Sequence, residues 1–265
     1  MNRYQLPTDF DETSLLAGHV GDCRLAIAPE RTLSAIHLDT YDWRLHRAGL
    51  ALVEERDRGG KLVLLDRGLE PYSIAAETTP RMAADLPEGH LAERVRPLMG
   101  IRALIPVGAA RVDRRDGRIE NADGEMLARL RFETVHPLDT AGNPTTAVDI
   151  LEVRGGPAAA ELVFKAGLAT IAEHDLEAVD AARGRFPGDY TSKFRVVLDH
   201  DGPAEASLRT ILLELLTTLE TNVEGTIEDI DSEFLHDFRV ACRRTRSALT
   251  QLKGVLPGEI TAPFN

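Results

Sequence analysis

Residues 236–249 read HDFRVACRRTRSAL, and this stretch sets the fold of the C-terminal part of the chain. With one residue every 100° around a helix, its basic side chains fall on one arc and its apolar side chains on another. The stretch therefore predicts an amphipathic helix, with the apolar arc facing a core and a stripe of cations facing outward. The stripe contains His236, Arg239, Arg243, Arg246 and, further along the chain, Lys253, and Arg244 lies on its flank.

Cations that repeat along one helix face suit a linear polyanion. An arginine guanidinium binds two phosphate oxygens at once, and a histidine beside phosphates gains a proton. The alternative is a solvated face whose cations pair with acids of the same chain. Residues 214–234 carry seven acids and no base, so the sequence leaves this pairing open.

The helical pattern extends upstream and ends soon after the basic stripe. Apolar residues recur at helical spacing from residue 205, which predicts a first helix. Ser232 is the predicted N-cap of the second helix, which should end at residues 253–254, with Pro257 just beyond.

The first 155 residues have a different pattern, of short strands joined by turns. The Asp116-Gly117 and Asp123-Gly124 pairs are strong turn signals. Hairpin-linked strands with a few helices predict an antiparallel α+β domain that can close into a barrel. We predict strands at 48–54, 61–65, 103–115, 118–121, 126–136 and 147–154, helices at 86–98 and 158–172, and a linker at 183–192.

Composition limits the compartment and the partners. The net charge is −12, whereas a general nucleic-acid binder is usually basic, so we expect no nucleic-acid partner and only a local site for polyanions. Cys23 and Cys242 stand outside any CxxC motif and should be free thiols. The polar N-terminus and the lack of a long apolar run predict a cytoplasmic protein with no membrane partner.

The stretch at 236–249 closely resembles the signature of CHAD domains, which are helical domains with a characteristic histidine and a basic surface that bind inorganic polyphosphate. The resemblance runs from about residue 205 to 257 and implies that the cationic stripe contacts polyphosphate. CHAD domains normally contain more helices, so we expect residues 200–265 to form only the start of one. An apolar arc left uncovered would also allow a homodimer.

Residues 37–52, HLDTYDWRLHRAGLAL, are similar to a stretch of CYTH domains, the triphosphate tunnel enzymes. The similarity covers about residues 1–195. It implies an antiparallel β-barrel of the triphosphate tunnel type, followed by the incomplete all-α domain. In that family, basic side chains grip a triphosphate and glutamates hold Mg²⁺ or Mn²⁺ for hydrolysis of a phosphoanhydride.

The set of residues that this family uses for catalysis is incomplete in the chain. No glutamates precede Arg3, and Val53, Glu55 and Ile150 stand where the family places functional charges. We therefore expect little or no triphosphatase activity and no certain cofactor. The remaining tunnel candidates are Arg3, Arg111, Arg114, Arg129, Arg131 and Lys193, with Glu133 and Glu152 as candidate metal ligands.

The sequence thus favours an inorganic polyphosphate-binding protein with a weakened or inactive tunnel domain, located in the cytoplasm, where polyphosphate granules are one expected site. Two alternatives remain. One is a divergent metal-dependent inorganic triphosphatase. The other is a protein-interaction module whose arginines pair with acidic protein surfaces.

Overall fold

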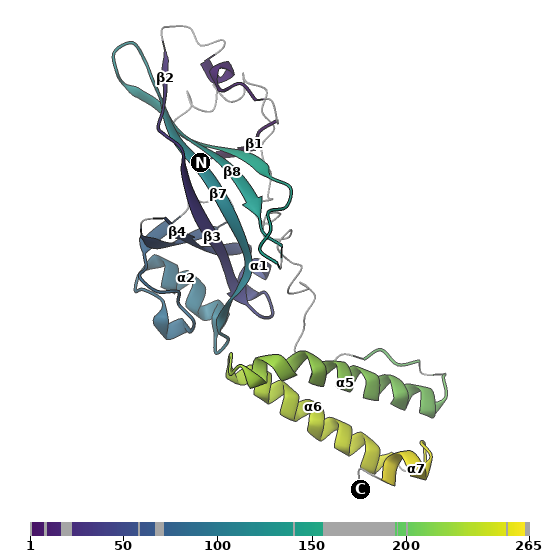
Figure 1. Cartoon of the computed structure of the whole chain (residues 1–265). Helices are drawn as coiled ribbons and strands as arrows, with labels where there is room; N and C mark the ends of the chain where they lie inside the picture. Colours follow the sequence, from purple (N-terminus) through teal and green to yellow (C-terminus); the bar gives the residue numbers. More distant parts are fainter. Residues whose placement is uncertain are drawn as a thin grey trace. The chain divides into compact units, whose positions relative to one another are not determined.

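The structure is a computed structural model. The chain forms two compact units (Figure 1). The sheet unit comprises Met1–Leu98 and Leu104–Gly188, and the helical unit comprises Met99–Ala103 and Asp189–Asn265. The predicted helix at 158–172, the linker at 183–192, Lys193 and Lys253 lie outside the residues that the structure describes. The described residues are 2–7, 10–16, 23–57, 59–66, 72–139, 141–155, 194, 196–199, 201–252 and 254–262.

The sheet unit is built on a curled antiparallel sheet, and its long central strands are visible in Figure 1. In the described part of the chain, the strand order is β1-β9-β8-β7-β3-β4-β5-β6, and β2 pairs with β7. The strands are β1 (Asn2–Gln5), β2 (Arg24–Ile27), β3 (Arg31–Thr40), β4 (Leu50–Arg56), β5 (Gly60–Asp66), β6 (Tyr72–Ala75), β7 (Leu104–Glu120), β8 (Met126–Pro137) and β9 (Val148–Gly155). The short helices are η1 (Glu12–Leu16), α1 (Arg44–Arg47), η2 (Ala83–Asp85) and α2 (His90–Met99). An antiparallel sheet followed by C-terminal helices confirms the predicted fold class.

The predicted turn at Asp116-Gly117 is wrong, because β7 continues through it. Gly117 pairs with Ile27 of β2 on one side and with Leu130 of β8 on the other. Pairing on both sides satisfies the backbone, so tertiary context overrides the local turn preference. The turn at Asp123-Gly124 is confirmed, with the Gly124 amide donating to the carbonyl oxygen of Asn121 at 3.0 Å.

Two apolar clusters occupy opposite faces of the sheet. Ile150 belongs to one cluster and Leu151 to the other, as expected when successive side chains of a strand alternate between faces. The Ile150 cluster contains Val53 and Ile150, two positions at which the resemblance described above places functional charges. Its buried members are Leu33, Ala35, Val53, Val63, Ala110, Val112, Val135 and Ile150.

The helical unit is centred on a hairpin of two long helices, α5 (Ala204–Ile227) and α6 (Ser232–Gln251), followed by α7 (Gly258–Thr261). Leu215 of α5 and Ala241 and Leu249 of α6 are buried in the hairpin, which confirms that the apolar arc of α6 faces a core. None of the helices in the described residues is long and apolar enough to cross a membrane.

The start of α6 is fixed by a buried ion pair. Its N-cap is Asp231 and not the predicted Ser232, and the Asp231 carboxylate accepts a hydrogen bond from the Glu233 amide at 3.0 Å. The same carboxylate lies 3.2 Å from the guanidinium of Arg102, whose side chain is fully buried. Arg102 also lies 3.5 Å from Asp237 and 5.1 Å from the ring centre of Phe234. A residue from the middle of the chain is therefore part of the helical core.

Candidate functional site

The basic stripe predicted on α6 forms an exposed surface. Each of its described members has an exposed side chain: His236, Arg239, Arg243, Arg244 and Arg246. The ion pairs of the helical unit are made by Arg102, and no arginine of the stripe pairs with an acid among the described residues. The acids of residues 214–234 therefore leave these arginines available to a ligand.

The spacing of the stripe suits a repeating anion. At 1.5 Å per residue, Arg239 and Arg243 are about 6 Å apart along the helix axis, and Arg243 and Arg246 are about 4.5 Å apart. Arg244 lies beside them, with its guanidinium 5.5 Å from the ring centre of Phe194. Several phosphate groups of one chain could thus be contacted by a single helix.

A cavity lies between α5 and α6 on the flank of the stripe. Its volume is about 410 Å³, and two of the predicted phosphate-binding residues, His236 and Arg244, contribute to its lining. The remaining lining residues are Phe194, Leu215, Thr218, Glu233, Asp237, Val240 and Ala241. Phe194 carried no sequence signal, because it lies at the very end of the predicted tunnel domain and outside any periodic segment.

Arg114 is the tunnel candidate with the most complete set of contacts, and all of them are to the protein itself. Its guanidinium donates to both carboxylate oxygens of Glu55, at 2.8 and 2.7 Å, and to Glu133 at 2.6 Å. Lys61 lies 2.8 Å from Glu55 as well. With only 3% of the Arg114 side chain exposed, the guanidinium is enclosed in this ion triad of Glu55, Arg114 and Glu133.

The other described tunnel candidates are spread over β1, β7 and β8, and several of them are paired. Arg131 lies 3.0 Å from Asp116 and 3.9 Å from Glu152, and Arg154 lies 2.6 Å from Glu152. Arg154 was missed from the sequence, although it follows Glu152 by two residues and so shares its face of β9. Arg111 lies 3.6 Å from Asp113, the Arg129 guanidinium contacts the sulfur of Met126 at 3.4 Å, and the backbone of Arg3 in β1 pairs with Glu152.

The described residues do not fit the divalent metal that the tunnel family would hold. Glu133 is bound by Arg114, and Glu152 is bound by Arg154. In the part of the chain that the structure describes, no group of three or more histidine, cysteine, aspartate or glutamate side chains could hold a metal ion. One or two carboxylates already paired with arginine are a poor site for a hard cation.

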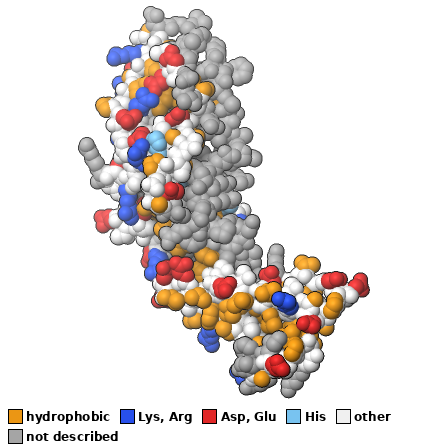
Figure 2. Space-filling view, turned by 45° about the vertical axis from the view of Figure 1, so that its right-hand side comes forward, with side chains coloured by type: hydrophobic (Ala, Val, Ile, Leu, Met, Phe, Trp, Pro, Cys, Tyr) orange, Lys and Arg blue, Asp and Glu red, His pale blue; other side chains and the backbone are white. Residues whose placement is uncertain are grey.

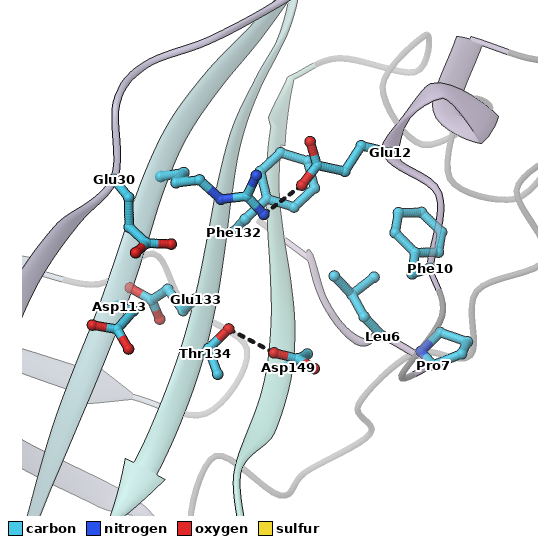
Figure 3. Close-up of a pocket in the computed structure, with 11 residues that line it drawn as sticks. Leu6, Pro7, Phe10, Glu12, Glu30, Asp113, Phe132, Glu133, Thr134 and Asp149 are labelled. Carbon is cyan, nitrogen blue, oxygen red and sulfur yellow. Dashed lines mark hydrogen bonds and ion pairs between the residues drawn. The ribbon is translucent and has the colours of Figure 1, made fainter.

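A pocket of the sheet unit, with a volume of about 160 Å³, has a lining rich in acidic side chains (Figure 3). Figure 3 shows the carboxyl groups of Glu30, Asp113 and Glu133 gathered on one side. Its arginine, Arg115, is paired with Glu12. An excess of carboxylates repels phosphate, so this pocket is unsuited to a triphosphate.

The triad also predicts how the sheet unit responds to acid. Burial alone would raise the pKa of Glu55, but hydrogen bonds and charges from Arg114 and Lys61 outweigh it and lower this pKa from 4.5 to about 2. Because the folded pKa lies below the unfolded one, the Glu55 carboxylate stabilises the fold above pH 4.5, and this contribution is lost as the pH falls toward 2.

We therefore expect the thermal midpoint of the sheet unit to fall between pH 4.5 and 2 by more in the parent chain than in a Glu55→Gln variant. Calorimetry across this range measures the difference. Parallel pH dependences for the two proteins would contradict the assignment of this titration to Glu55.

Comparison with known proteins identifies the segment that carries the stripe. Residues 210–265 match the family model of the CHAD domain. This match confirms the resemblance seen at residues 236–249. The CHAD segment, residues 210–265, contains all the exposed cations of the stripe on α6.

Two solved structures resemble the larger part of the chain. A proposed adenylyl cyclase from Hippeastrum, with a dominant triphosphatase activity, is 13% identical with a TM-score of 0.45, and the match covers 72% of this chain and 98% of that one. A proposed adenylate cyclase from Bacillus halodurans is 14% identical with a TM-score of 0.37, covering 68% and 92%. Similarity at this level carries no argument about activity. No curated protein matches the chain.

Proposed function

We propose that this protein binds inorganic polyphosphate through the stripe on α6, and that it does so in the cytoplasm, at polyphosphate granules. The observation that carries the proposal is a row of exposed arginines in a CHAD segment, none of them paired with an acid among the described residues. Against a net charge of −12, such a row is a local exception that needs an anionic partner.

A double variant, Arg239→Ala with Arg243→Ala, tests the proposal. Each lost charged contact should cost about 1.5–3 kcal/mol, so the pair should weaken binding of long polyphosphate by roughly 100-fold or more. Binding to the parent chain should also fall steeply with salt, since neutralised phosphates release counterions. Titration calorimetry at two salt concentrations measures both effects.

Arg209→Ala is the matched control, because Arg209 is an exposed cation on α5 outside the stripe. It should bind polyphosphate as the parent chain does. If the double variant binds polyphosphate at low salt as tightly as the parent chain does, the proposal is wrong.

The sheet unit should contribute no appreciable hydrolysis. The Glu55–Arg114–Glu133 triad and the apolar cluster around Val53 and Ile150 support this expectation. We expect phosphate release from tripolyphosphate, with Mg²⁺ or Mn²⁺ at neutral to alkaline pH, to stay below about 1 s⁻¹, the low end of ordinary enzyme turnover. Faster metal-dependent release would favour the alternative of a divergent triphosphatase.

A protein-interaction module is the second candidate, and an exposed apolar surface on α5 favours it. Four apolar side chains of α5 are spaced so that they share one helix face. They are Leu213, Leu216, Val223 and Ile227, which are 56%, 49%, 39% and 79% exposed. Figure 2 shows hydrophobic side chains gathered over the helical unit. Surfaces of this kind mark contacts with other proteins. Absence of polyphosphate binding would give this candidate priority.

A further inference from the structure

The cavity between α5 and α6 has two kinds of lining. Leu215, Val240 and Ala241 give it apolar walls, whereas its polar lining consists of Arg244, His236, Thr218 and the carboxylates Glu233 and Asp237. His236 also belongs to the exposed stripe, so the cavity adjoins the surface proposed for polyphosphate. A ligand could therefore occupy both places at once.

An inorganic phosphate chain does not account for this cavity. Such a chain has no apolar surface, so it would gain nothing from the apolar walls or from the ring of Phe194. The volume of about 410 Å³ lies in the range of pockets that take organic molecules. The occupant should therefore have a bulky, partly apolar portion.

The aromatic wall points to a flat portion. Phe194 already lies beneath one planar group, the guanidinium of Arg244, at 5.5 Å from the ring centre. Nucleic-acid bases pack against aromatic rings and arginine planes of this kind. Since an aliphatic ligand would use only part of this arrangement, a planar heterocycle fits it best.

Glu233 determines which end of the ligand can lie next to it. Its carboxylate accepts hydrogen bonds, so it suits the N–H donors on the edge of a base and repels phosphate. Phosphates must then lie away from Glu233, toward His236 and the arginines that follow it on α6. Guanine, with two adjacent N–H donors, matches a carboxylate particularly well.

We propose that this cavity binds the base of a nucleoside triphosphate, with the base against the Phe194 side of the cavity and beside Arg244, while the phosphates lie on the stripe from His236 to Arg243. The placement of the phosphates on the stripe rests on the proposed function, whereas the placement of the base rests on the cavity alone. The helical unit thus recognises a nucleotide as well as a bare phosphate chain.

Calorimetry with the full chain tests the assignment, using GTP and tripolyphosphate as probes. The two carry similar charge, so their difference reports the base. GTP should bind at least about tenfold more tightly than tripolyphosphate, as expected from stacking of one base. Phe194→Leu should remove about that factor for GTP and leave tripolyphosphate unchanged. Equal affinity of the two probes, or an equal loss for both in Phe194→Leu, would overturn the assignment.

Further comparisons separate this inference from the proposed function. Arg239→Ala with Arg243→Ala should weaken both probes. If long polyphosphate fails to bind but GTP responds to Phe194→Leu, the proposed function fails and the cavity assignment stands. If polyphosphate binds through the stripe but GTP gains nothing over tripolyphosphate, the cavity assignment fails alone. Tighter binding of a single-stranded oligonucleotide than of GTP would overturn the mononucleotide in favour of a nucleic acid.

Discussion

An Arg114→Met variant should lose about 3–5 kcal/mol of the free energy of unfolding of the sheet unit, because it leaves two buried carboxylates without their cation. Glu55 and Glu133 lie within 2.8 Å of the guanidinium, and Arg114 is 3% exposed. Lys61 would retain one contact to Glu55, but Glu133 would lose its only arginine among the described residues.

Tryptophan fluorescence in a urea titration measures this loss. The chain has one tryptophan, and Trp43 is fully buried in the sheet unit, so its signal reports that unit. The control is the triple variant Arg114→Met, Glu55→Leu and Glu133→Leu. It should recover most of the stability, because replacing a whole buried ion cluster by apolar side chains is often neutral or stabilising. A loss below about 1 kcal/mol in the single variant would show that the triad is dispensable.

Local patterns made much of the fold predictable. Turn signals between the segments located β4, β5, β8 and β9 within a few residues, and helical spacing located α5 and α6. The stripe on α6 was predictable for the same reason, because one helix carries all of it. Segments whose structure depends on distant partners were not predictable. At Asp116-Gly117, pairing with β2 and β8 extends a strand through a strong turn signal.

The residues around Glu55 show that contacts between side chains distant in the sequence were not predictable either. The sequence identified Val53, Glu55 and Ile150 as departures from the tunnel pattern, which predicted a loss of function without giving its structural form. The partner of Glu55 is Arg114, 59 residues away, and no local rule pairs them. In the structure, Val53 and Ile150 belong to an apolar cluster, and Glu55 neutralises the charge of Arg114.

The fully buried ion pair between Arg102 and Asp231 is a second non-local contact, between residues 129 positions apart. Because Asp231 is also the N-cap of α6, an Arg102→Met variant should act on the helix that carries the stripe. It leaves the charges of Asp231 and Asp237 without this arginine, so we expect a loss of about 3–5 kcal/mol in the stability of the helical unit.

Amide hydrogen exchange in α6 measures this effect, and the first turns of the helix should lose the most protection. Adding Asp231→Asn and Asp237→Asn should restore part of it, because asparagine still caps a helix and both buried charges are gone. Arg209→Met is the control for removing an arginine from the helical unit: Arg209 is exposed on α5, so its loss should cost less than about 1 kcal/mol. Unchanged exchange in α6 of the Arg102 variant would mean that the cap alone fixes the helix. With protection lost as expected, polyphosphate binding should weaken too, because the stripe exists only while α6 is folded.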